Sequence, residues 1–83
     1  MKAIKFYAQW CQPCKTLTEV IKTAGDKITT PIVEMDIDEE MMTAVTYNVR
    51  SVPTMILLDE NEKEIKRQVG VMTEQQLVEF LKG

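Results

Sequence analysis

The chain has 83 residues, 45% of them hydrophobic and 28% charged, and its net charge is -3. A chain of this length supplies one hydrophobic core, so we expect a single domain over residues 1–83. The charges are scattered without a basic block, which argues against nucleic acid as a partner, and no apolar run approaches the roughly 20 residues of a membrane span. No signal-peptide core precedes the first predicted strand, so we expect a cytoplasmic protein.

The first predicted element is a β-strand over residues 2–8, in which the side chains alternate between two faces. One face carries Ile4, Phe6 and Ala8, and the other carries Ala3, Lys5 and Tyr7. From Cys14 to Ala24 the apolar residues recur at helical spacing, and Gly25 is the expected left-handed stop. Cys11 is therefore expected at the amino end of this helix.

The middle of the chain predicts a second strand, over residues 31–35, followed by a short helix. Asp38, Glu39 and Glu40 precede that helix, where its dipole favours negative charge. We expect the helix to run to about Tyr47 and to end at Asn48, because asparagine tolerates the left-handed conformation.

The last third of the chain predicts a β-hairpin and a final helix. Residues 54–58 form an apolar strand, and a polar turn separates them from a strand over residues 64–69. Thr73 and Gln76 have the spacing of a helix capping box. The resulting order β-α-β-α-β-β-α predicts an α/β fold, in which three helices flank a four-stranded mixed sheet.

The two cysteines, Cys11 and Cys14, are three positions apart. A disulfide across so short a loop constrains the unfolded chain very little, so a structural crosslink is disfavoured. A zinc site needs four ligands, usually cysteine and histidine, and the sequence has no histidine and no second cysteine pair. The spacing therefore indicates redox chemistry, and no metal is expected.

Three segments of the sequence together resemble one family. They are Phe6-Tyr7-Ala8-Gln9-Trp10-Cys11-Gln12-Pro13-Cys14-Lys15, Tyr47-Asn48-Val49-Arg50-Ser51-Val52-Pro53-Thr54 and Val69-Gly70-Val71. These segments resemble the active-site segment, the cis-proline segment and the neighbouring glycine loop of thioredoxins. The resemblance covers the chain from Lys2 onward. It implies a thioredoxin-like fold and a protein-disulfide reductase that works by dithiol exchange.

The resemblance implies that Cys11 is the nucleophile and Cys14 the resolving cysteine. Free cysteine has a pKa of about 8.5, so the attacking sulfur must be activated to a thiolate at neutral pH. The helix N-terminus and the charge of Lys15 would both favour that thiolate. Pro13 is expected to stiffen the first turn of the helix.

The same resemblance implies that Pro53 is cis and that backbone groups of Val52 pair with an extended target segment. Trp10, Gly70 and Val71 are expected to join Val52 and Pro53 in a small apolar patch around the nucleophile, with Trp10 partly exposed. Such a patch would accept many disulfides in loops or unfolded segments by contact area.

Charge departs from the family pattern at two positions. Thioredoxins place a buried aspartate six residues before the first cysteine and pair it with a lysine on the next strand, whereas this sequence has Lys5 and Glu34 there. Since a charge buried alone would cost several kcal/mol, the reversal of both signs predicts an ion pair with its ends exchanged. A solvated edge without contact is the alternative. An ammonium near the dithiol would favour thiolate, where the family's carboxylate acts as a base.

Two further departures concern length and redox potential. The N-terminal strand and helix usual in the family have no counterpart, which makes the chain as short as a glutaredoxin. Gln12 stands where thioredoxins usually have glycine, so the family's redox potential does not carry over.

The electron donor and the targets follow only from the resemblance. No bound cofactor is expected, because electrons would come indirectly from NADPH through thioredoxin reductase. The targets would be proteins with disulfides, ribonucleotide reductase among the candidates, and we expect a monomer.

Two alternative functions stay open. One is a glutaredoxin-like reductase that uses glutathione, against which the run Gly70-Val71-Met72-Thr73 lacks the usual Gly-Gly and acidic segment. The other is a non-catalytic protein-binding module.

Overall fold

The computed structural model describes residues 1–83, and its strands and helices follow the predicted order. The elements are β1 (Lys2–Tyr7), α1 (Gln12–Ala24), β2 (Ile32–Asp36), α2 (Met41–Thr46), β3 (Thr54–Leu58), β4 (Glu64–Val69) and α3 (Glu74–Leu81). A single turn of 3-10 helix, Gly25–Lys27, follows α1 and was not predicted.

The strands form one mixed sheet in the order β2-β1-β3-β4. β1 pairs with β2 in parallel and with β3 in antiparallel orientation, and β3 and β4 form the predicted antiparallel hairpin. β1 and β3 therefore occupy the middle of the sheet. Their register places Phe6 opposite Thr54, near the end of the sheet where α1 begins.

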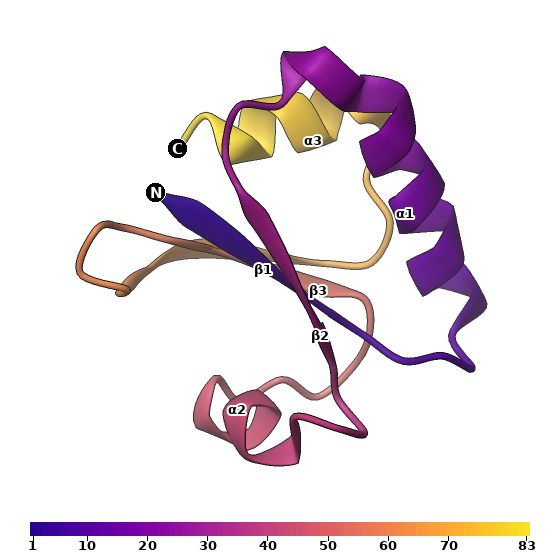
Figure 1. Cartoon of the computed structure of the whole chain (residues 1–83), viewed down its shortest axis with the longest axis vertical. Coiled ribbons are helices and arrows are strands. Elements are labelled where there is room, and N and C mark those ends of the chain that lie inside the picture. The colour runs from indigo at the N-terminus through magenta and orange to yellow at the C-terminus, as the bar shows by residue number, and fades with distance from the viewer.

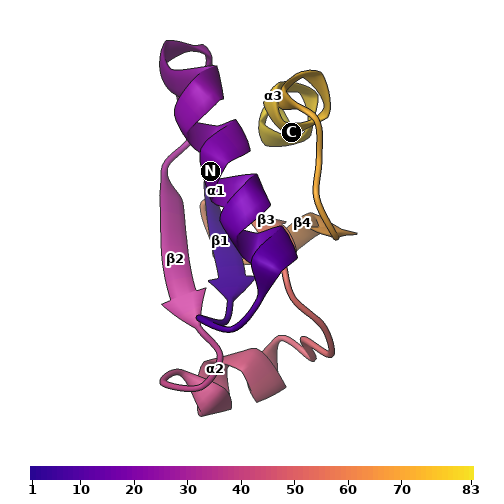
Figure 2. The ribbon, with the colours of Figure 1, turned by 90° about the vertical axis from the view of Figure 1, so that its right-hand side faces the viewer.

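Helices cover both faces of the sheet. Figures 1 and 2 show α1 and α3 together on one side and α2 on the other. The alternation in β1 decides which residues meet which helices. Ala3 belongs to the buried cluster that includes Leu17 of α1 and Leu77 of α3, whereas Phe6 belongs to the cluster that includes Ala44 of α2. The faces predicted for this strand are both confirmed.

The predicted boundaries of the first two strands differ from the observed ones by one residue. β1 ends at Tyr7 because the carbonyl of Ala8 accepts the N–H of Cys11, at 3.1 Å, in the turn before the helix. α1 begins at Gln12, directly after Cys11 as expected, and β2 lies one residue later than predicted. Gly25 ends α1 with a φ of 45°, a conformation that favours glycine.

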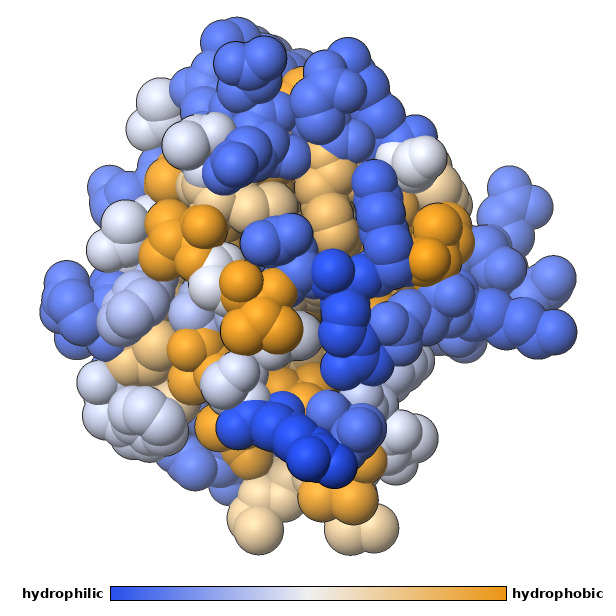
Figure 3. All heavy atoms as spheres, turned by 180° about the vertical axis from the view of Figure 1, so that it is seen from behind, coloured by the Kyte–Doolittle hydropathy of each residue, from blue (hydrophilic) through white to orange (hydrophobic).

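The outer surface of α2 is apolar at several positions. Met41, Met42 and Val45 are all exposed, and Figure 3 shows apolar side chains at the lower end of the molecule, where α2 lies. None of the helices combines the length and the apolar character that a membrane crossing requires.

The capping box predicted for α3 is present. The Thr73 hydroxyl accepts the backbone N–H of Gln76 at 3.1 Å, and the Gln76 side chain accepts the backbone N–H of Thr73 at 2.9 Å. Thr73→Ala should therefore lower the free energy of unfolding by about 1 kcal/mol, because the backbone N–H of Gln76 loses its partner. Urea unfolding measures the change, and Gln75→Ala, at an exposed position in the same turn, is the control. An equal effect of both substitutions would contradict the capping role.

Candidate active site

The two cysteines lie at the start of α1 and form a disulfide, with their Cα atoms 5.3 Å apart. Cys11 is the N-cap residue of the helix, and its Sγ accepts the backbone N–H of Cys14 at 3.1 Å. Both side chains are buried, Cys11 being 4% exposed and Cys14 2% exposed. The predicted placement of Cys11 at the helix N-terminus is confirmed.

The sequence next to the cysteines explains why the helix begins there. Pro13 lies in the first turn of α1, where a missing N–H leaves no hydrogen bond unmade. Lys15 follows Cys14 and is exposed, so its charge lies at the surface of the first turn. The first turn has no acidic side chain, and its Cys14 N–H points at the sulfur of Cys11.

A second segment reaches the cysteines from the start of β3. The Val52-Pro53 peptide bond is cis, as the resemblance implied, and the Val52 carbonyl oxygen lies 3.7 Å from Sγ of Cys11. The Pro53 carbonyl accepts the N–H of Gly70 at 2.9 Å, and Gly70 has a φ of 95°. The structure thus brings together residues from three distant parts of the sequence.

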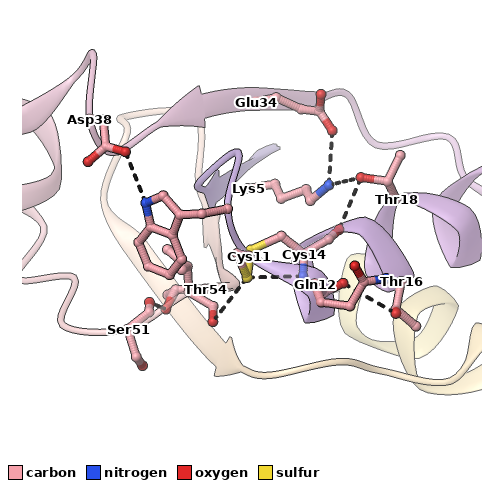
Figure 4. The surroundings of a disulfide bond; sticks show 12 residues. Lys5, Cys11, Gln12, Cys14, Thr16, Thr18, Glu34, Asp38, Ser51 and Thr54 are labelled. Atoms are coloured by element: carbon pink, nitrogen blue, oxygen red, sulfur yellow. Dashed lines mark hydrogen bonds and ion pairs between the residues drawn. A yellow bond between two sulfur atoms is a disulfide. The ribbon is translucent and has the colours of Figure 1, made fainter.

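Only some of the residues predicted for the apolar patch around Cys11 expose their side chains. Trp10 is 70% exposed and Val71 is 41% exposed, while Val52 is intermediate. The Pro53 ring is fully buried because it faces the interior at the start of β3, so this residue presents backbone and not an apolar surface. The indole N–H of Trp10 donates to Asp38 at 3.2 Å, which fixes the exposed ring beside the disulfide (Figure 4).

Lys5 and Glu34 meet beneath α1. Nζ of Lys5 lies 3.2 Å from Oε2 of Glu34, across the paired strands β1 and β2. Their burial differs, because the Lys5 side chain is 1% exposed and the Glu34 side chain is 50% exposed. The alternative in which neither side chain makes a contact is therefore wrong. What the pair does for the dithiol stays a prediction.

Sequence reasoning did not single out Thr18, which contacts Cys14, or Asp36, which is buried at the end of β2. The Thr18 hydroxyl accepts a hydrogen bond from Lys5 and donates one to the carbonyl oxygen of Cys14, at 3.1 Å (Figure 4). Its position one turn after Cys14 on α1 was the available signal. Asp36 is buried at the end of β2, where it accepts the N–H of Asp38 at 2.8 Å.

Comparison with known proteins decides the family. The family model described as Thioredoxin matches residues 2–83. The chain belongs to the thioredoxin family. It is 37% identical to the thioredoxin of Chlamydia trachomatis over 79 residues, which cover 94% of this chain and 76% of the relative. It is 36% identical to a thioredoxin of Staphylococcus epidermidis over 83 residues, covering 98% of this chain and 79% of the relative.

Solved thioredoxin structures share the fold. A mutant thioredoxin from Halobacterium salinarum superposes with a TM-score of 0.86 at 32% identity, covering 96% of this chain and 70% of that one. Thioredoxin 1 from Thermosipho africanus gives a TM-score of 0.82 at 28% identity, covering 99% of this chain and 91% of that one. The thioredoxin-like fold predicted from the sequence is confirmed.

Family membership and the paired cysteines together establish the chemistry. This thioredoxin-family chain is a thiol–disulfide oxidoreductase whose redox couple is the Cys11–Cys14 pair. Its partners, as for the family in general, are target proteins with disulfides and a reductase that restores the dithiol.

Proposed function

We propose that the chain reduces protein disulfides, with Cys11 as the nucleophile and Cys14 as the resolving cysteine. The observation that carries this assignment is the hydrogen bond from the backbone N–H of Cys14 to Sγ of Cys11, at 3.1 Å. A backbone N–H at a helix N-terminus stabilises negative charge, so Cys11 is the sulfur favoured as thiolate in the reduced protein. Lys15 adds a positive charge in the same turn.

The exchange would run in two steps, and the two cysteines are the only groups of this chain that react. The Cys11 thiolate attacks one sulfur of the target disulfide, forming a mixed disulfide and releasing the other target sulfur as a thiolate. The Cys14 thiolate then attacks Sγ of Cys11, which forms the internal disulfide and releases the second target sulfur. Two electrons pass from the protein to the target, and both released thiolates take protons from water.

The target would bind through the backbone of Val52. In the oxidised chain its N–H makes no hydrogen bond, and its carbonyl has no partner other than the nearby sulfur of Cys11. An extended segment of the target can pair with these groups as a short strand, which brings its disulfide to Cys11. Trp10 and Val71, both exposed, would add apolar contact on either side of the segment.

The electrons would come from NADPH through thioredoxin reductase, and no bound cofactor is required of the chain itself. We propose a monomer that works in the cytoplasm on disulfides of other proteins, including those formed in enzymes such as ribonucleotide reductase. The proposed activity requires neither nucleic acid nor a membrane.

The experiment is a coupled assay in which NADPH loss follows reduction of a protein disulfide. One reaction contains thioredoxin reductase, and the other contains glutathione and glutathione reductase. We expect turnover with thioredoxin reductase and background rates with glutathione. Turnover only with glutathione would assign the chain to the glutaredoxin-like alternative, and no turnover in either reaction would contradict a general reductase.

A further inference from the structure

Lys5 is a buried positive charge with its hydrogen-bonding groups engaged. Its Nζ donates to Oε2 of Glu34 at 3.2 Å and to the hydroxyl of Thr18, and it lies 5.7 Å from the centre of the Tyr7 ring. An ammonium has three N–H donors, and here it meets a carboxylate, a hydroxyl and an aromatic face. These contacts hold the charge at a fixed place beneath the first turns of α1.

The ion pair does not cancel the charge of Lys5 toward the interior. The Glu34 side chain is 50% exposed, so water screens its negative charge, whereas the Lys5 side chain is 1% exposed. Charges in a buried site act over a distance more strongly than charges in contact with water. The field that reaches α1 from this pair is therefore net positive.

Thr18 connects this charge to the resolving cysteine. Its hydroxyl accepts a hydrogen bond from Lys5 and donates to the Cys14 carbonyl oxygen at 3.1 Å. Figure 4 shows Nζ of Lys5 pointing to Glu34 and Thr18, next to the turn that carries Cys14. One hydroxyl group thus separates the ammonium from the backbone of Cys14, while Cys11 lies at the other end of the disulfide, against Val52.

The other groups around Cys14 supply no competing base. A pocket of about 380 Å³ opens beside Cys14, and Tyr7, Ala8, Gln9, Lys15 and Thr18 complete its lining. None of these residues is a carboxylate. Lys15 adds positive charge from α1, and burial, followed by the charge of Asp36 and then that of Glu34, raises the pKa of Tyr7, which stays a neutral phenol.

Asp36 is the one buried carboxylate of the chain. It lies on β2, opposite Tyr7 of β1, and Tyr7 lines the pocket. Its oxygens are engaged elsewhere. One accepts the backbone N–H of Asp38 at 2.8 Å, and the other accepts the side-chain amide of Gln9 at 3.4 Å. Asp36 is absent from the lining of the pocket, so the pocket brings no carboxylate to Cys14.

We propose that Lys5 is a positioning residue of the second step, in which its buried ammonium, oriented by Thr18 and Glu34, stabilises the Cys14 thiolate that resolves the mixed disulfide. The inference rests on the proposed function. The thiol of Cys14 loses its proton to water in the pocket, its thiolate attacks Sγ of Cys11, and the bond between Cys11 and the target breaks with the electron pair leaving on the target sulfur. Attack by Cys11, the first step, depends on the helix N-terminus and changes less.

The two steps are separable with an aromatic disulfide reagent that releases a coloured thiolate at each step. In stopped-flow mixing with the reduced protein, the first release reports attack by Cys11 and the second reports resolution by Cys14. The main variant is Lys5→Met with Glu34→Gln, which removes both charges and shortens only the side chain at position 5, by one atom. The matched control is Lys22→Met with Glu19→Gln, which removes an exposed ion pair on α1 whose charged atoms are 3.5 Å apart.

In the main variant we expect the second release to slow about tenfold at neutral pH and its pH midpoint to rise by about one unit, since one pKa unit is a factor of ten. The rate of the first release in the main variant, and the rates of both releases in the control variant, should change little. Glu34→Gln alone should move the midpoint of the second release to lower pH, because the charge of Lys5 is then uncompensated. Thr18→Val should raise the pH midpoint of the second release, because the Lys5 ammonium loses the hydroxyl that orients it.

Two results would overturn the inference while leaving the proposed function intact. One is a second release with unchanged rate and pH midpoint in a main variant whose circular dichroism is that of the parent. The other is a pH midpoint that responds to Asp36→Asn and not to the charge of Lys5, which would make Asp36 the base. Absence of both releases in the parent protein would instead refute the proposed function itself.

Discussion

Cys11→Ser should reduce turnover of protein disulfides to the background rate, because a serine hydroxyl is not ionised at neutral pH and does not attack a disulfide. Cys14→Ser should block the reaction later. It leaves Cys11 able to attack, but the mixed disulfide then has no internal thiol to resolve it. The two substitutions are therefore expected to give different products.

The measurement combines the NADPH-coupled assay with mass spectrometry of the protein after one exposure to the target. We expect a stable adduct with the target in Cys14→Ser and none in Cys11→Ser. An adduct on Cys14 in Cys11→Ser would reverse the two roles. Full biological activity of the double variant would support the non-catalytic binding module, since both sulfurs would then be dispensable.

Leu17→Ala should destabilise the fold by about 2 to 5 kcal/mol, the usual cost of removing a buried leucine side chain. Leu17 is fully buried in the cluster between the sheet and the helices α1 and α3. A domain of this size has a total stability of roughly 5 to 10 kcal/mol, so the substitution removes a large part of it. The same helix is capped by Cys11 and contains Cys14, which makes its packing a condition for activity.

Urea unfolding of the reduced and oxidised forms measures this loss. Val45→Ala on α2 is the matched control, because it also removes methyl groups but from a side chain that is 71% exposed. Substitutions at such surface positions are usually within about 0.5 kcal/mol of zero. A similar loss for both variants would show that the cluster at Leu17 does not dominate the stability.

Local signals in the sequence predicted most of the fold. The apolar run at residues 54–58 and the strand at residues 64–69 were placed with their observed bounds, because a polar turn with clear limits separates them. Asn48 has the expected left-handed conformation, with a φ of 56°. Thr73 caps its helix as expected. In each case, neighbours in the sequence supply the forces that decide the local structure.

Contacts between distant segments were harder to predict. The alternating strand pattern put Lys5 on a partly buried face, but it gave no means of knowing that Thr18 would meet its ammonium. The unequal burial of Lys5 and Glu34 depends on β2 being an edge strand, which is a property of the whole sheet. The Pro53 ring turned inward for a similar reason, since the apolar character of proline does not decide which side of a segment faces water.

The position of β1 and β3 in the middle of the sheet has a consequence for how the protein responds to heat. β1 leads into the turn that holds Cys11, and β3 begins directly after Pro53, with Phe6 paired to Thr54 between them. Fraying starts at edges and termini, where few contacts resist it, and reaches the central strands last. The distance between Sγ of Cys11 and the backbone of Val52 is therefore preserved when β2 or β4 opens partially. It changes only when the whole domain unfolds.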